Sequence, residues 1–194
     1  IKGKKILVHG GGRELDLFLK KNNHPIKMLN GRRITDKKTL DYALMIYAGK
    51  INKEIVAKLQ SLKINSLGLC GADANSVLCK LRTKNELDYG YVGDIVSINS
   101  GFFKLILENN IIPVCSSITY DKDGLLLNTN ADTIASEISS NMSKIYETQL
   151  WYCFEEKGVY QSDNKKNIIH KLDMATFKSL KSKGVISKGM IPKV

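Results

Sequence analysis

Asn128-Thr129-Asn130-Ala131-Asp132 separates an apolar run, Leu125–Leu127, from a helical pattern over Thr133–Met142. Asn and Asp side chains at such a boundary can accept hydrogen bonds from the unpaired N–H groups of the first helical turn. Taken alone, the stretch predicts a capped helix. A second interpretation is a ligand site, because a helix N-terminus attracts anions and a carboxylate there can position cationic side chains.

A triple-glycine turn lies near the start of the chain. Lys4–Val8 has the composition of a buried strand, His9-Gly10-Gly11-Gly12 follows it, and Arg13–Asn22 has a helical pattern. This order aims backbone N–H groups at a phosphate or carboxylate. The spacing is neither that of a P-loop nor that of the Rossmann dinucleotide motif. A plain tight turn stays open as an alternative, although three adjacent glycines cost backbone entropy that such a turn does not require.

Strand-like and helical segments alternate along the rest of the chain. Strands are predicted over Ile64–Leu69, Ile111–Ile118 and Gln149–Phe154, and antiparallel hairpins over Val77–Ile98 and Thr119–Leu127. Helices are predicted from a cap at Thr35 or Asp36 to Tyr47, over Ile51–Leu62 after an interruption at Gly49, from a cap at Asn99 or Ser100 to Leu107, and over Met174–Lys183. The alternation predicts an α/β fold with an open, mainly parallel sheet and helices on both faces.

The composition is that of an ordinary globular protein, with 43% hydrophobic and 25% charged residues among 194. This length suits one substantial domain or two small lobes that share a sheet. No apolar run approaches the roughly 20 residues of a membrane span. Four widely spaced cysteines indicate buried free thiols in a reducing cytosol, so we expect a cytoplasmic protein. Three histidines without metal-type spacing predict no metal site.

The formal net charge of +11 raises the question of nucleic acid binding. Lysines and arginines are scattered over many segments. They form no aromatic-rich basic stripe of the kind that stacks nucleic acid bases. We therefore expect no nucleic acid partner, and a positive field that helps to collect anionic substrates. The chain starts at Ile1 directly before a strand and ends at Val194 directly after a charged motif, so we expect it to be truncated at both ends.

Two further stretches complete a set of four motifs. Asn30-Gly31-Arg32-Arg33-Ile34-Thr35 places two arginines before a helix, where they could clamp a carboxylate or form a surface charge pair. Gly189-Met190-Ile191-Pro192-Lys193 lies near the end. In their order and spacing, these two stretches, the triple-glycine turn and Asn128–Asp132 resemble the N-acetylglutamate kinases of the amino acid kinase family, over essentially the whole chain.

The resemblance implies a three-layer αβα sandwich and a reaction, in which ATP phosphorylates the γ-carboxylate of an N-acylglutamate on the route to arginine. It implies N-acylglutamate and MgATP as ligands and a homodimer as the assembly. Residues 1–194 would form one amino acid kinase domain. Within it, residues 1–127 would be mainly the acylglutamate-binding lobe, with a lid hairpin near residues 77–98, and residues 128–194 would start the nucleotide-binding lobe.

Roles for individual residues also follow from the resemblance. Gly11 and Gly12 would lie between the acylglutamate and the transferred phosphoryl group. Arg33 would pair with the α-carboxylate of the substrate, and Asn128 would bind the acylamino acid.

Other residues would serve the phosphoryl group and the nucleotide. Asp132 would orient the catalytic lysines, and Lys193 would stabilise the transition state. The nucleotide-contacting positions would be Glu155, Lys157, Gly158, Val159, Val185, Ile186 and Ser187. Mg²⁺ would be held largely by ATP itself, so few dedicated carboxylate ligands are expected.

Two features of the family are absent from this sequence. These are an N-terminal strand with a K-x-G-G loop, whose lysine contacts the phosphoryl group, and the segments that follow the G-M-I-P-K lysine. The alternatives are therefore a non-catalytic acylglutamate-binding or regulatory module on the same fold, or a related kinase that acts on an amino acid, a carbamate or a nucleotide. The choice between acetyl and longer acyl groups, the oligomeric state and feedback by arginine stay open.

Overall fold

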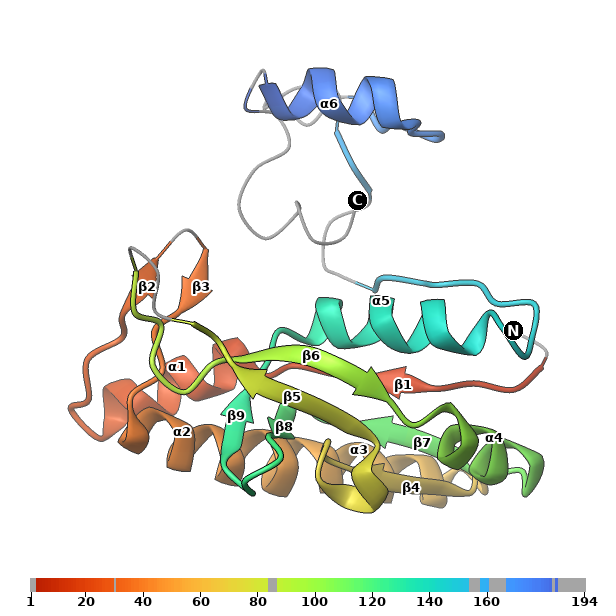
Figure 1. The fold of residues 1–194 in the computed structure, drawn as a ribbon, viewed down its shortest axis with the longest axis horizontal. Helices are drawn as coiled ribbons and strands as arrows, with labels where there is room; N and C mark the ends of the chain where they lie inside the picture. The colour runs from red at the N-terminus through yellow and green to blue at the C-terminus, as the bar shows by residue number, and fades with distance from the viewer. Residues whose placement is uncertain are drawn as a thin grey trace. The chain divides into compact units, whose positions relative to one another are not determined.

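The computed structural model describes residues 3–29, 31–83, 87–153, 158–160, 167–182 and 184 (Figure 1). The chain divides into two compact units, Ile1–Gln149 and Leu150–Val194. All the strands and every helix but one lie in the first unit as far as it is described. The assignment of an acylglutamate lobe and a nucleotide lobe stays a prediction.

A three-stranded parallel sheet forms the middle of the first unit. Its strands are β1 (Leu7–Val8), β7 (Ile112–Cys115) and β4 (Ser66–Leu69), in the order β1-β7-β4. Pro113 is tolerated in the central strand for a geometric reason. The amide of Ile112 donates towards β4, to Asn65 O, so the nitrogen of Pro113 faces β1, where pairing starts only at Leu7–Val114.

A second sheet contains the two predicted hairpins. Its strands are β6 (Gly93–Ile98), β5 (Val77–Leu81), β8 (Ile118–Tyr120) and β9 (Leu126–Asn128), in the order β6-β5-β8-β9. The hairpins β5–β6 and β8–β9 are antiparallel and β5–β8 is parallel, so both predicted hairpins are confirmed.

The strand predicted over Ile111–Ile118 is wrong in one respect, because it is split between the two sheets. The amide of Ser116 donates to Leu69 O in β4, whereas Ser117 O accepts a hydrogen bond from the amide of Thr129, just beyond β9. The chain therefore changes partners at these two serines, and β7 and β8 belong to different sheets.

Four helical segments lie in the N-terminal third of the chain. They are α1 (Gly12–Lys21), α2 (Lys37–Ala43), the π-helix η1 (Leu44–Ile51) and α3 (Asn52–Ser61). Asp36 caps α2 as predicted, with its carboxylate 2.7 Å from the amide of Thr39. The predicted interruption at Gly49 is wrong, since α2, η1 and α3 follow one another without a break and the wide π-turns accommodate the glycine. Between α1 and α2 lies a small hairpin of β2 (Met28–Leu29) and β3 (Arg32–Arg33).

The opposite face carries α4 (Ser100–Glu108) and α5 (Ala131–Met142), capped by Asn99 and Asn130. One hydrophobic core packs α4 and α5 against residues of β4, β5, β7 and β9, and a second packs α1, α2 and η1 around Ile118 of β8. Figure 1 shows α5 on one side of the strands and α1 to α3 on the other. The predicted three-layer α/β sandwich is therefore confirmed.

The second unit contains α6 (Met174–Ser182) and an isolated bridge between Tyr160 and Ile168. Gly184 follows α6 with φ +74°, the left-handed conformation expected of a glycine at the end of a helix. The predicted strand over residues 149–154 is wrong where it is described, because residues 149–153 form no strand. Trp151 is 59% exposed there, so the run lacks the burial on both faces that an inner parallel strand has.

Candidate active site

The triple-glycine turn touches the start of α5. The turn follows β1, and a Cβ atom on Gly10 would lie 3.6 Å from the Cβ of Ala131. Two of the four motifs singled out in the sequence therefore meet at the carboxyl end of the parallel strand β1. This is the edge where open α/β sheets place their ligands.

Gly11 is enclosed by two side chains of η1. A Cβ atom on Gly11 would lie 2.4 Å from Ile51 Cδ1 and 2.7 Å from Tyr47 Cδ1, so no larger residue fits. Gly12 has more room, because its Cβ would be 3.9 Å from the nearest atom, Arg33 Nη2. No side chain of the described residues caps the N-terminus of α1 at Gly11, which leaves this helix end suited to an anion.

Arg33 lies beside this turn with its guanidinium only partly satisfied. Its Nη2 donates to Asp16 Oδ1 at 2.6 Å and, more weakly, to Gly12 O at 3.4 Å. The side chain is 9% exposed, and Nη1 is a buried nitrogen without a hydrogen-bond partner in the described part of the chain. An unpaired buried donor is costly, so Nη1 is a position where a ligand oxygen would be stabilising.

Tyr47 lies beside both Gly11 and the Arg33 guanidinium. Burial raises the pKa of its hydroxyl, and the Arg33 guanidinium opposes this shift without cancelling it. Tyr47 is therefore protonated at neutral pH, with an aromatic ring against Gly11 and a neutral hydroxyl near the guanidinium.

His9 is neutral and held in one tautomer. Asn52, which is 1% exposed, donates from Nδ2 to Val114 O at 2.8 Å and to His9 Nε2 at 3.1 Å. The other ring nitrogen, Nδ1, lies 2.9 Å from Gly10 O and carries the proton. Burial lowers the pKa of His9, with a smaller opposing effect from this contact with Gly10. The network fixes the glycine turn to the central strand of the sheet.

Asn128 is linked to the twin-arginine stretch through Thr35. Its side-chain Nδ2 donates to Thr35 Oγ1 at 3.0 Å, and its backbone N–H donates to Tyr91 O at 2.9 Å. Thr35 is fully buried and pairs with the hairpin backbone, donating to Tyr89 O and accepting from the amide of Tyr91. Hydrogen bonds therefore connect the loop between β5 and β6 to both Asn128 and Thr35.

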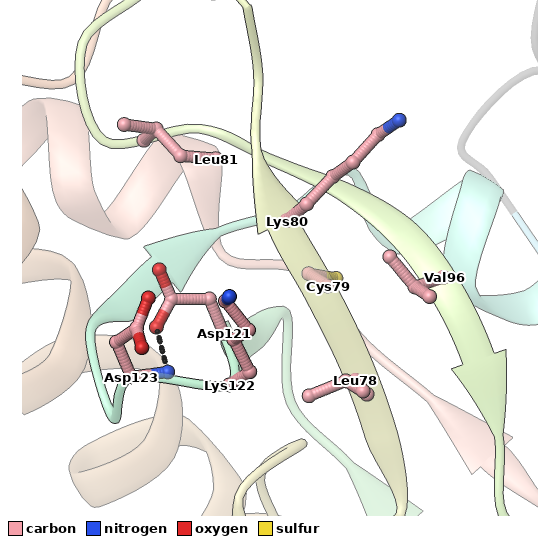
Figure 2. A pocket seen from close by; sticks show the side chains of 8 residues that line it. All are labelled: Leu78, Cys79, Lys80, Leu81, Val96, Asp121, Lys122 and Asp123. Carbon is pink, nitrogen blue, oxygen red and sulfur yellow. Dashed lines mark hydrogen bonds between the residues drawn. The ribbon is translucent and has the colours of Figure 1, made fainter.

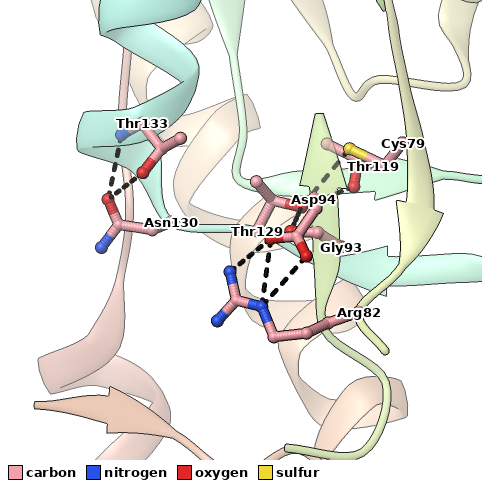
Figure 3. Close-up of polar contacts among 8 residues, drawn as sticks. All are labelled: Cys79, Arg82, Gly93, Asp94, Thr119, Thr129, Asn130 and Thr133. Atoms are coloured by element: carbon pink, nitrogen blue, oxygen red, sulfur yellow. Dashed lines mark hydrogen bonds and ion pairs between the residues drawn. The ribbon is translucent and has the colours of Figure 1, made fainter. Parts of the chain in front are cut away.

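The remaining residues of the Asn128–Asp132 stretch are held from both sides (Figure 3). Thr129 is buried, with its hydroxyl 2.7 Å from the hydroxyl of Thr119. Asn130 accepts a hydrogen bond from the amide of Thr133 at 3.0 Å. Asp132 lies in the first turn of α5. The capped-helix interpretation of this stretch is therefore confirmed, and its role as a ligand site stays a prediction.

An ion pair spans the hairpin near its tip. Arg82, one residue beyond β5, donates from Nη2 to Asp94 Oδ1 in β6 and from Nε to Oδ1 and Oδ2 of the same carboxylate, at 3.0 and 3.2 Å (Figure 3). The pair is partly buried and bidentate, the geometry in which such a contact contributes most. It joins the two strands at the end of the hairpin that carries the connecting loop.

Most of the predicted nucleotide positions cannot be located. Lys193, Glu155, Lys157, Val185, Ile186 and Ser187 lie outside the described residues. Gly158 and Val159 are described in the second unit, where Val159 O accepts a hydrogen bond from the amide of Ile169 at 2.7 Å. The catalytic and nucleotide-binding roles of all these residues stay predictions.

The sequence did not reveal several residues that shape this site. They are Asp16, Tyr47, Ile51 and Asn52. Tyr47 and Ile51, four positions apart beside other apolar residues, have the spacing of ordinary core residues. A single acidic residue on α1, such as Asp16, is typical of a solvated helix face. Nothing in the local pattern separated these residues from neighbours without contact to Gly11 or Arg33.

A shallow depression of about 320 Å³ lies elsewhere, between the outer part of the β5–β6 hairpin and the β8–β9 turn (Figure 2). Its lining residues are Leu78, Cys79, Lys80, Leu81, Val96, Asp121, Lys122 and Asp123. Asp121 accepts a hydrogen bond from the amide of Asp123 at 3.0 Å, so this carboxylate already serves its own turn. None of the predicted site residues lines the depression.

Three further findings concern the described residues. They contain no group of three or more His, Cys, Asp or Glu side chains arranged to hold a metal ion. The cysteines Cys70, Cys79, Cys115 and Cys153 are free thiols, but the expected burial is found only for Cys79 and Cys115, because Cys70 is partly exposed and Cys153 is exposed. Full burial raises the pKa of Cys115 to about 12. No helix in this part of the chain is long and apolar enough to cross a membrane.

Comparison with known proteins gives one consistent result. The model of the amino acid kinase family matches residues 2–194. An acetylglutamate kinase from Parabacteroides distasonis is 45% identical over 195 residues, which cover 100% of this chain and 76% of the relative. One from Cytophaga hutchinsonii is 46% identical and is covered to 74%.

Solved structures agree with the fold. A crystal structure of a Streptococcus mutans protein superimposes with a TM-score of 0.87 at 28% identity, covering 97% of this chain and 74% of that one. An N-acetylglutamate synthase from Neisseria gonorrhoeae, in complex with coenzyme A and N-acetylglutamate, gives a TM-score of 0.59 at 19% identity, over 69% of this chain and 31% of that one. At that identity, the second match shows a shared fold only.

Proposed function

The chain belongs to the amino acid kinase family, and on this premise we propose that it transfers the γ-phosphoryl group of ATP to the γ-carboxylate of N-acetyl-L-glutamate or a closely related N-acylglutamate, in arginine biosynthesis. The similarity to acetylglutamate kinases runs along the whole chain and supports this substrate class. As in other kinases of the family, ATP enters as its magnesium complex, in which phosphate oxygens and water are the main ligands of the ion.

The observation that carries the proposal is the state of Arg33. Its guanidinium is almost entirely buried beside the triple-glycine turn, and one of its nitrogens has no partner in the described part of the chain. A buried cationic donor without a partner is stabilised by an anionic oxygen. The α-carboxylate of an N-acylglutamate is such a group, and Asn128, joined to this stretch through Thr35, would bind the same molecule.

The glycine turn suits the reacting end of the substrate. A γ-carboxylate oxygen attacks the γ-phosphorus of ATP in line, ADP leaves, and an acyl phosphate forms. Such a reaction needs positioned donors more than covalent help from the protein. Backbone N–H groups of Gly11 and Gly12 at the uncapped start of α1 would supply donors, and the absence of side chains would let the phosphoryl group approach closely.

The other predicted residues complete the proposal. Asp132 would orient the catalytic lysines, and Lys193 would neutralise charge in the transition state. The nucleotide would contact the two stretches 155–159 and 185–187. A homodimer is a further prediction from the family resemblance, and a cytoplasmic location is one from the cysteine pattern.

The β5–β6 hairpin would serve as the lid over the acyl side. An acyl phosphate is readily hydrolysed, so exclusion of water protects the product. The hydrogen bonds between Thr35 and the hairpin backbone would tie the lid to the residues that hold the substrate.

A coupled assay of ADP formation tests the proposal, with N-acetylglutamate, N-succinylglutamate, glutamate, aspartate and UMP as acceptors. We expect turnover with an N-acylglutamate and none with the free amino acids or UMP, and hydroxylamine should trap the acyl phosphate. Calorimetry separates the remaining alternative, because binding of N-acetylglutamate without binding of MgATP would identify a non-catalytic module. Turnover of UMP or of free glutamate in preference to every N-acylglutamate would overturn the proposal.

A further inference from the structure

The Arg33 guanidinium lies beside Tyr47 of η1, and its two closest hydrogen-bond acceptors among the described residues lie on α1. Asp16 Oδ1 and Gly12 O, both on α1, accept hydrogen bonds from the same nitrogen, Nη2, at 2.6 and 3.4 Å. Gly12 and Asp16 are four positions apart, so they lie on one face of α1, one turn from each other. The second terminal nitrogen, Nη1, is buried and has no hydrogen-bond partner among the described residues.

We infer that Asp16 is a positioning residue for substrate binding, which holds Arg33 so that Nη1 faces the α-carboxylate of the acylamino acid. The inference rests on the function proposed above and adds the element that orients Arg33. Asp16 does not contact the substrate in this arrangement. It acts by restricting a long side chain that would otherwise lose rotamer freedom each time the substrate binds.

The arrangement also sets the distance between the two ends of the substrate. The N-terminus of α1 is the uncapped glycine turn proposed for the phosphoryl group, and the next turn of the same helix carries Asp16. The position of the Arg33 guanidinium relative to the glycine turn is therefore fixed by a rigid helix rather than by a loop. A substrate with a different spacing between its two carboxylates would fit one end and miss the other.

The charge on Asp16 has a second, opposing effect. A carboxylate beside Arg33 reduces the net positive charge that attracts the substrate. Asp16 therefore weakens the electrostatic attraction while it fixes the geometry of the guanidinium. Asparagine offers an oxygen acceptor of the same shape without the charge. Asp16→Asn and Asp16→Ala therefore separate the positioning role from the charge.

The experiment measures kcat and KM for N-acetylglutamate and for ATP in the wild type, Asp16→Ala, Asp16→Asn and Asp41→Ala. Asp41 is the matched control, an exposed carboxylate that pairs with Lys37 on α2. We expect Asp16→Ala to raise the KM for N-acetylglutamate about tenfold, with kcat and the KM for ATP changed by less than about twofold. Asp16→Asn should restore a KM equal to or below that of the wild type, and Asp41→Ala should leave all constants unchanged.

Two results would overturn the inference: an unchanged KM in Asp16→Ala, or an Asp16→Asn variant as impaired as Asp16→Ala. Melting temperatures of all four proteins show whether a loss of activity comes from unfolding. Unfolding would lower kcat, and Asp16→Asn would then not restore the KM selectively. Wild-type activity is measured first. If the wild type does not phosphorylate any N-acylglutamate, the proposed function itself fails, whereas an active wild type with an indifferent Asp16 rejects only the positioning role.

Discussion

Gly90 lies so close to Thr35 that a Cβ atom on Gly90 would be 2.2 Å from the carbonyl oxygen of Thr35. The backbone of Gly90 has φ +70°, a conformation that other residues seldom adopt. On either side of this contact, Thr35 exchanges backbone hydrogen bonds with Tyr89 and Tyr91. The proposed lid and the stretch that contains Arg33 are therefore joined by one close backbone contact.

Replacement of Gly90 by alanine should disturb the fold and the substrate site together. The added methyl group meets backbone that cannot rotate away, and the positive φ adds strain, so we expect a loss of about 2 kcal/mol or more in the free energy of unfolding. The KM for N-acetylglutamate should also rise, because Thr35 precedes the capped α2 and follows Arg33 closely. Urea unfolding and steady-state kinetics measure the two effects.

Gly124 provides the control for this prediction. It has φ +83° and no atom within 4 Å of its virtual Cβ, so Gly124→Ala carries only the backbone cost of about 1 kcal/mol. Equal losses of stability in Gly90→Ala and Gly124→Ala would contradict the importance of the contact with Thr35.

The two glycines of the turn should separate a packing role from a chemical one. Gly11→Ala places its methyl group against Tyr47 and Ile51, so it should lower the melting temperature markedly. Gly12→Ala has room and should fold with near wild-type stability, yet we expect a loss of kcat of at least about tenfold if a phosphoryl group approaches the backbone there. Full activity in Gly12→Ala would count against the proposed phosphoryl site.

The pH dependence of stability should carry the signature of His9. Burial lowers its pKa below the ordinary 6.5, so the unfolded chain binds the proton more readily than the folded one. This contribution to stability is complete well above pH 6.5 and is lost as the pH falls through 6.5 towards the lowered pKa. The unfolding free energy of the wild type should therefore fall between about pH 7.5 and about pH 5.5.

His9→Gln tests this because glutamine does not titrate. The variant should be less stable overall, since Asn52 loses its imidazole partner, but its stability should change less over the same pH interval. Asp36 also has a lowered pKa, but its ordinary value of 3.8 places its effect at lower pH in both proteins. Parallel curves for wild type and variant would contradict a buried, neutral His9.

The sequence predicted those features that depend on local chemistry. Asp36, Asn99 and Asn130 cap their helices because a short polar side chain at that position satisfies nearby amides, whatever the rest of the fold does. The hairpins followed for a similar reason, since alternating residues flank turn-forming ones. The four motifs gave the family, because their order and spacing are specific even though each is weak alone.

The errors came from tertiary contacts that a local pattern does not contain. Gly49 would favour a break in an isolated helix, but the packing of Tyr47 and Ile51 against Gly11 holds η1 together. The apolar run that forms β7 and β8 looks like one strand in the sequence. It is two strands because the hydrogen-bond partner changes from β4 at Ser116 to Thr129 at Ser117. Asp16 became significant only when the structure placed it against Arg33.

Arg33 itself offers the most direct test of the carboxylate site. Arg33→Glu should weaken binding of N-acetylglutamate by about a hundredfold or more, because a donor that meets the carboxylate is replaced by a repelling group. Arg33→Lys should lose about tenfold, since a single ammonium cannot serve Asp16 and the substrate with the geometry of a guanidinium. Affinity for MgATP should change by less than about threefold in both variants, as measured by calorimetry on protein shown to be folded.

Arg32 supplies the control for this experiment, because successive residues of β3 project to opposite sides of the strand. Arg32→Ala removes the same charge from the neighbouring position, so it should leave affinity for N-acetylglutamate within about twofold of the wild type if the effect belongs to the site and not to the net charge of the protein. A loss in Arg32→Ala as large as that in Arg33→Lys, or equal losses of MgATP and N-acetylglutamate in Arg33→Glu, would mean that Arg33 does not hold the α-carboxylate. The buried Nη1 would then have to be satisfied by a group other than this substrate.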